Sequence, residues 1–193
     1  MKPILSIFSL FLMLTCSNNQ ILEQAENKYY EIIDFKPTDT LYRVSANEYQ
    51  LGEEFGYINQ KGDTIIPNGL YIQSFSDTII NYGFVVQKIG DRADIIAINQ
   101  KGQKLYEVHW FDNGPDYIEN GAFRILRNGK IGFADSTGKI IVTPQFDCAY
   151  PFSDGKAKVS YECDLVKDLE HTAMKSHSWF YIDKNGQRIK LNK

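Results

Sequence analysis

The stretch KIGFADSTGKIIVTPQFDCAYPFSDGKAKV, residues 130–159, decides the fold of this chain. Apolar residues such as Ile131 and Phe133 alternate with small or polar ones on both sides of the tetrapeptide DSTG. Such alternation is typical of strands with one buried face. Asp135 suits the opening of a type I turn, and Gly138, three places later, suits the left-handed position of a bulged hairpin. The stretch therefore predicts a β-hairpin.

The same hairpin pattern occurs four times along the chain. The four segments are FGYINQKGDTII (55–66), IIAINQKGQKLY (95–106), IGFADSTGKIIV (131–142) and WFYIDKNGQRIK (179–190). Their turn glycines are Gly62, Gly102, Gly138 and Gly186, and Asn or Asp stands three places before each. A short strand pattern precedes each hairpin, at residues 42–44, 84–86, 123–125 and 157–159. Each unit is therefore expected to be a three-stranded meander, and spacings of 40, 36 and 48 residues between the glycines indicate a repeat protein.

These units predict an all-β fold over residues 29–193, in which tandem antiparallel meanders stack in an open array and each covers its neighbour. A closed, propeller-like ring is the alternative. The apolar segment YYEIIDF, residues 29–35, is expected to form a strand or a short covering element. The last spacing holds an insert, residues 161–178, whose centre LVKDLEHTAMK favours two or three turns of helix.

The third unit carries further motifs. After its hairpin come Pro-x-Phe-Asp, residues 144–147, and Phe-Ser-x-Gly, residues 152–155. With these motifs the stretch resembles the bacterial WG repeat, and Phe55-Gly56 and Ile131-Gly132 occupy the positions of the dipeptide that names it. The resemblance extends over residues 41–193. It implies a repetitive β architecture and no particular activity, because WG repeats share none.

The first sixteen residues resemble a bacterial lipoprotein signal. Lys2 precedes an apolar run, residues 4–14, that is shorter than the roughly 20 residues needed to span a bilayer. Residues 13–16, Met-Leu-Thr-Cys, resemble the lipobox, whose cysteine becomes the acylated first residue of the mature chain. We therefore expect acyl chains on Cys16 that anchor the protein to a membrane, with cleavage and secretion without a lipid as the alternative.

The resemblance to a lipoprotein also sets the expected boundaries and location. It implies a signal peptide at residues 1–15, and a polar tether follows at residues 16–28. Ser17 resembles the signals that send lipoproteins to the outer membrane, where the protein is expected to face the periplasm. The chain of 193 residues has 21 basic and 24 acidic residues that are scattered along it, so no basic stripe indicates nucleic acid as a partner.

Two segments contain residue types that are common in active sites. In His109-Trp110-Phe111-Asp112 a histidine stands near an aspartate, but no motif places a Ser or Cys nucleophile. His171 and His177 stand near Glu170 and Cys163, in a spacing that matches no ordinary zinc pattern. We therefore expect no catalytic residue, no metal and no cofactor.

Cys148 and Cys163 are the other two cysteines of the chain. Export would place them in an oxidising compartment, where a disulfide between them could form. The alternative is a pair of separate, buried thiols. Both alternatives remain open at the level of the sequence.

Most aromatic residues stand at strand positions, where they are expected to pack in the core. Those between the units are expected to be exposed and could form a binding surface, namely Tyr71, Trp110, Tyr117 and Tyr150. The preferred function is that of a non-catalytic, membrane-anchored envelope lipoprotein that binds a protein partner or an envelope component through its repeat surface. A carbohydrate-binding module is the second class of function, and an uncharacterised enzyme is the third.

Overall fold

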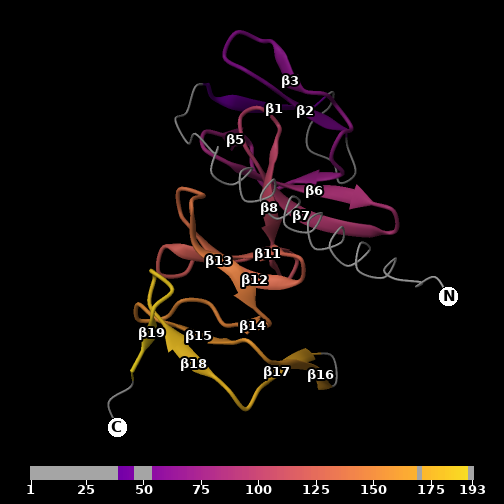
Figure 1. Ribbon diagram of the computed structural model, residues 1–193. Coiled ribbons are helices and arrows are strands. Elements are labelled where there is room, and N and C mark those ends of the chain that lie inside the picture. The colour runs from indigo at the N-terminus through magenta and orange to yellow at the C-terminus, as the bar shows by residue number, and fades with distance from the viewer. Residues whose placement is uncertain (1–38, 46–53, 169–170, 191–193) are drawn as a thin grey trace, which may run out of the picture. The chain divides into compact units, whose positions relative to one another are not determined.

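The computed structural model in Figure 1 describes residues 39–45, 54–168 and 171–190. The expected signal peptide, Cys16, the tether and the segment at residues 29–35 lie outside the described residues. Within the described part all regular structure is β, and none of the sheets closes on itself. The expected all-β fold in an open array is thus confirmed. A helix long and apolar enough to cross a membrane does not occur among these residues.

Each of the four predicted units forms a three-stranded antiparallel meander. The strands are β1 (Leu41–Ser45), β2 (Phe55–Ile58) and β3 (Thr64–Ile66) in the first unit; β6 (Gly83–Ile89), β7 (Arg92–Ile98) and β8 (Lys104–Val108) in the second; β11 (Ala122–Arg127), β12 (Lys130–Asp135) and β13 (Ile140–Phe146) in the third; and β15 (Ala157–Ser160), β18 (Phe180–Ile182) and β19 (Arg188–Ile189) in the fourth. Short strands lie in the excursions between them: β4 (Gln73–Ser74), β5 (Thr78–Ile79), β9 (Trp110–Phe111), β10 (Gly114–Pro115) and β14 (Cys148–Ala149).

The second and third units share one sheet, which was not expected from the sequence. Its seven strands have the order β13-β12-β11-β8-β7-β6-β4, because β8 pairs with β11 so that Val108 lies opposite Ile125. The first and fourth units form separate four-stranded sheets, β3-β2-β1-β5 and β14-β15-β18-β19. The middle joint of the array is therefore made edge to edge by main-chain hydrogen bonds.

The four turns that end in glycine have the same hydrogen bonds. In the first, the Gly62 N–H donates to the Asn59 carbonyl at 3.0 Å, while Asn59 Oδ1 accepts from the N–H groups of Lys61 and Asp63 at 2.9 Å each. Equivalent bonds occur at Asn99, Asp135 and Asp183. The glycines have φ angles of 86°, 71°, 90° and 76°, which agree with the left-handed conformation predicted for them.

One contact recurs at the joints between successive units. At each joint the residue four places after one turn glycine touches the turn glycine of the next unit. A Cβ on Gly102 would lie 3.2 Å from Ile66, a Cβ on Gly186 would lie 3.5 Å from Val142, and the Tyr106 hydroxyl donates to the Gly138 carbonyl at 2.8 Å. The repeat in the sequence is thus also a repeat in packing.

Two apolar cores lie between pairs of units, as expected when each unit covers its neighbour. The first combines residues of the first and second units: Leu41, Phe55, Tyr57, Ile66, Tyr71, Ile79, Val85, Ile96 and Ile98. The second combines residues of the third and fourth: Ala122, Ile131, Phe133, Val142, Phe146, Ala149, Phe152, Ala157, Val159 and Ile182. Burying one large apolar side chain of this kind contributes about 1.5–3 kcal/mol.

The helix predicted in the insert is wrong. Antiparallel strands β16 (Asp164–Asp168) and β17 (His171–Lys175) occur there instead, with Asp168 paired with His171. Both ends of this segment are held at Ser160, whose hydroxyl donates to the Glu162 carbonyl and bonds to the Ser176 hydroxyl, each at 2.8 Å. A helix of this length would move its ends about 15 Å apart. A hairpin returns them to one place.

Candidate binding surface

The excursion between the second and third units carries a short hairpin. In it β9 pairs with β10, so that Trp110 lies opposite Pro115 and Phe111 opposite Gly114. Four large apolar side chains of this excursion are exposed: Trp110 (41%), Phe111 (44%), Tyr117 (57%) and Ile118 (48%). We call these four residues the β9–β10 surface. Four exposed apolar side chains within nine residues are unusual for a surface with no partner.

A buried ion pair fixes the base of this excursion. Arg124 of β11 and Asp116 are each 4% exposed. Arg124 Nε donates to Asp116 Oδ2 at 2.9 Å and Nη2 donates to Oδ1 at 2.6 Å, while the Arg124 N–H donates to Oδ2 at 2.8 Å. Nη1 donates to the Ala149 carbonyl at 3.2 Å. The bidentate geometry satisfies both charges, as burial requires.

The ion pair also positions an aromatic ring of the β9–β10 surface. The guanidinium carbon of Arg124 lies 5.9 Å from the ring centroid of Phe111, within the range of a cation–π contact. The Phe111 ring in turn meets Tyr117 edge-on, with centroids 5.1 Å apart. The Phe111 and Tyr117 rings are therefore held by neighbouring side chains and lose less conformational freedom on binding.

His109 lies beside this ion pair. The main-chain N–H of His109 donates to the main-chain carbonyl of Arg124 at 3.2 Å. The main-chain carbonyl of His109 accepts from the main-chain N–H of Asp116 at 2.9 Å. Burial lowers the pKa of the His109 imidazole, the Arg124 charge lowers it further, and Asp116 opposes both. Nδ1 is buried and has no partner among the described residues. Because Nδ1 has no hydrogen-bond partner among the described residues, Asp116 does not orient the His109 imidazole through Nδ1 as a catalytic pair would require.

The structure separates the four aromatic residues that the sequence proposed for a binding surface. Trp110 and Tyr117 belong to the β9–β10 surface, and Tyr150, 39% exposed, lies in the next excursion. The expectation that Tyr71 is exposed is wrong, because only 6% of it is accessible. Tyr71 packs in the first core, and its hydroxyl reaches the Gly102 carbonyl at 3.4 Å.

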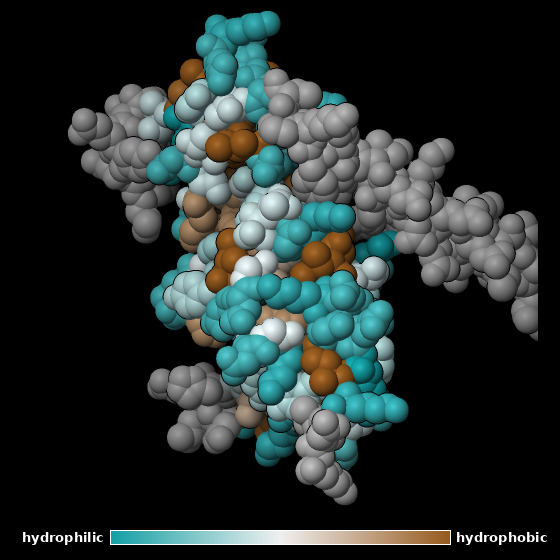
Figure 2. All heavy atoms as spheres, turned by 90° about the vertical axis from the view of Figure 1, so that its left-hand side faces the viewer, coloured by the Kyte–Doolittle hydropathy of each residue, from teal (hydrophilic) through white to brown (hydrophobic). Residues whose placement is uncertain are grey.

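Tyr150 belongs to a second aromatic group. Its ring contacts Trp179 with centroids 5.4 Å apart, and Lys158 Nζ lies 4.9 Å from the Trp179 ring centroid. On the face drawn in Figure 2, hydrophobic residues form several separate patches among hydrophilic ones. Exposed apolar side chains on that face are therefore divided into local groups.

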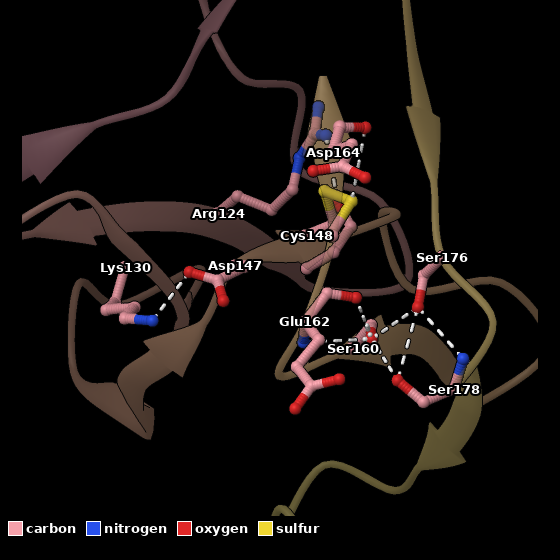
Figure 3. Close-up of a disulfide and its surroundings, with 11 residues drawn as sticks. Arg124, Lys130, Asp147, Cys148, Ser160, Glu162, Asp164, Ser176 and Ser178 are labelled. Atoms are coloured by element: carbon pink, nitrogen blue, oxygen red, sulfur yellow. Dashed lines mark hydrogen bonds and ion pairs between the residues drawn. A yellow bond between two sulfur atoms is a disulfide. The ribbon is translucent and has the colours of Figure 1, made fainter. Parts of the chain in front are cut away.

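Cys148 and Cys163 form a disulfide in the structure, with their Cα atoms 5.8 Å apart (Figure 3). The bridge ties the insert to β14, because Cys163 directly precedes β16 and Cys148 is buried in β14. Cys163 is thereby removed as a metal ligand. No group of three or more His, Cys, Asp or Glu residues is placed to hold a metal within the described ranges, and the His171 side chain lies outside them.

Sequence reasoning missed several residues of this surface. Nothing in the spacing of Asp116 and Arg124, eight residues apart, indicates that they pair across a strand. Phe111 and Ile118 could have been found, because they share one irregular segment with Trp110 and Tyr117, away from any alternating pattern.

Together the meanders, the repeated glycine joints and the exposed excursions define an open all-β repeat protein. Residues 131–162 match the family model described as WG containing repeat, a range that runs from β12 through β13, β14 and β15 to the start of the insert. This segment is therefore similar to a WG repeat. Comparison with curated proteins and with solved structures finds no match.

Proposed function

We propose that this chain is a non-catalytic envelope lipoprotein that binds a protein partner or an envelope component through the β9–β10 surface. The observation that carries the proposal is the group of four exposed apolar side chains, of which Phe111 lies over the buried Arg124–Asp116 pair and contacts Tyr117. Aromatic side chains are enriched at the centres of protein interfaces, where they bury large areas with few rotatable bonds. Rigid support of such side chains reduces the entropy lost on binding.

The lipid anchor on Cys16 and the location at the periplasmic face of the outer membrane form part of this proposal. They rest on the charged start, the short apolar run and the cysteine that follows it. Labelling of cells with a clickable palmitate analogue should mark the wild-type chain and leave the Cys16→Ser variant unlabelled. Equal labelling of both chains would contradict the anchor.

In-cell photocrosslinking tests the binding surface. A benzophenone amino acid at Tyr117 should capture one specific partner, identified by mass spectrometry, whereas the same probe at Ile89 should not. Ile89 is a matched control because it is 47% exposed and lies at the end of β6, outside the excursion. Capture at Tyr117 should be lost when Ile118 is also changed to Ser. Equal capture from both positions, or capture that survives Ile118→Ser, would argue against the proposal.

The non-catalytic part of the proposal is tested separately. His109 is the residue most similar to a general base, and its neighbours hold it in a structural setting. The purified protein is expected to turn over no substrate in panels of glycans, peptides and esters. Turnover that disappears in the His109→Ala variant would overturn this expectation.

A further inference from the structure

A concave surface of about 670 Å³ lies beside the insert and shares no residue with the β9–β10 surface. Its volume falls within the roughly 300–1,000 Å³ that is usual for ligand pockets. The residues that decide its chemistry are Glu162, Asp164, Lys175, His177, Ser178 and Trp179. They come from both strands of the insert hairpin and from the segments that join it to the fourth unit.

The walls of this concave surface are cross-linked. The Cys148–Cys163 disulfide holds one end of the hairpin, and in Figure 3 Ser176 and Ser178 converge on the Ser160 hydroxyl. The oxygen-to-oxygen distances from Ser160 are 2.8 Å to Ser176 and 3.1 Å to Ser178. Ser160 itself is fully buried. A site fixed in this way needs little ordering when a ligand binds.

The chemistry of the lining favours a neutral ligand that is rich in hydroxyl groups. The carboxylates of Glu162 and Asp164 are exposed acceptors, whereas the exposed Lys175 ammonium is a donor. Lys175 offsets one of the two carboxylates, so the lining has both signs of charge and a formal charge of −1, which does not attract anionic ligands. Hydroxyl groups can donate to the carboxylates in short, charge-assisted hydrogen bonds and accept from the ammonium.

Trp179 supplies the apolar part of the site. Its ring is half-buried, is held by Tyr150 and Lys158, and still borders the concave surface. Sugars combine hydroxyl groups with C–H faces that pack on aromatic rings. We infer that this surface binds a short neutral saccharide. The site does not depend on the proposed partner at the β9–β10 surface, so either can fail without the other.

The test uses the fact that the chain has two tryptophans, Trp110 and Trp179. In the full-length Trp110→Phe chain, purified in detergent, Trp179 is the only tryptophan, so its fluorescence reports on this site alone. Maltotriose, cellotriose and chitotriose are titrated separately, with calorimetry as a second readout. At least one of them should give a saturable change in fluorescence.

Two isosteric variants then locate the binding. Glu162→Gln and Asp164→Asn should each weaken binding of that saccharide by about tenfold, because each replaces a charge-assisted hydrogen bond with a neutral one. Asp91→Asn, an exposed carboxylate in the turn between β6 and β7, should leave the affinity within about twofold of the parent. Urea unfolding of each variant checks that the fold is retained.

Three results would overturn the inference. The first is the absence of any fluorescence or heat signal up to about 10 mM of each saccharide. The second is binding that Glu162→Gln and Asp164→Asn leave unchanged, which would place the saccharide elsewhere on the chain. The third is a response to neutral tripeptides that depends on both carboxylates while the saccharides give none, which would assign the site to peptides.

Discussion

Replacing Gly138 with Ala should destabilise this protein more than the same change at Gly62 or Gly186. Gly138 has a φ of 90°, and a Cβ there would lie 2.5 Å from Cδ1 of the Tyr82 ring. That ring stacks on Phe123, with centroids 5.8 Å apart, and cannot withdraw without giving up the contact. A Cβ on Gly62 would meet no atom within 4 Å, and one on Gly186 would make an ordinary contact.

The structure separates two contributions to the loss of stability. A Cβ in the left-handed region costs roughly 1–2 kcal/mol, and all three glycines share this cost. Overpacking against Tyr82 adds about 1–3 kcal/mol at Gly138 alone. We therefore expect a loss of roughly 2–5 kcal/mol for Gly138→Ala and about 1–2 kcal/mol for Gly62→Ala.

Urea unfolding followed by circular dichroism and by tryptophan fluorescence measures these losses, and agreement of the two probes tests whether the transition is cooperative. A double-mutant cycle with Tyr82→Ala isolates the contact, because removing the ring should reduce the cost of Gly138→Ala by about 1–3 kcal/mol. The same midpoint for Gly138→Ala and Gly62→Ala, together with an unchanged cost of Gly138→Ala in the Tyr82→Ala background, would show that the Tyr82 ring does not obstruct a Cβ at Gly138.

Three further predictions concern the ionisable and sulfur-containing groups. Burial lowers the pKa of His109 in the folded chain. As the pH falls below about 6.5, the unfolded chain therefore binds a proton at this residue before the folded chain does, and the free energy of unfolding decreases. His109→Gln should make urea midpoints less dependent on pH between about 6.5 and 5. Arg124→Met should cost about 3–5 kcal/mol by leaving Asp116 buried and unpaired, and adding Asp116→Leu should recover part of the loss in the same assay. Changing both Cys148 and Cys163 to Ala should cost about 3 kcal/mol, because the bridge spans 15 residues; a midpoint equal to that of the wild-type chain would contradict this.

The local elements of the fold were predicted well from the sequence, because the conformation of a turn depends mainly on residues that are adjacent in the chain. An Asn or Asp followed three places later by Gly determines the hydrogen bonds of a turn almost alone, as the four equivalent turns show. The strand before each hairpin was likewise found from alternation, and all four lie within meander strands. These features depend on neighbours in the chain, which the sequence displays.

The features that depend on distant residues could not be predicted. Leu165, Val166, Ala173 and Met174 have a spacing that fits a helix as well as a strand, and the choice is made by Ser160 and the disulfide, which bring the two ends together. Tyr71 follows a strand and looks exposed in the sequence, but the second unit covers it. For the candidate site, the exposed Trp110 and Tyr117 were predicted, whereas the Arg124–Asp116 pair that supports them was not.

The main-chain pairing of β8 with β11 makes the cooperative unit of this array larger than its sequence repeat. One repeat is a single meander, but the second and third meanders share a continuous hydrogen-bond ladder, whereas the outer joints rest on side chains and on the short strands of the excursions. Amide hydrogens of β7, β8, β11 and β12 should therefore exchange with solvent more slowly than those of β1 or β19, and should do so as one group. Cutting the chain between the second and third repeats would leave the edges of β8 and β11 without their hydrogen-bonding partners. Dividing the chain at an outer joint, between the first and second or the third and fourth repeats, would preserve more of the fold.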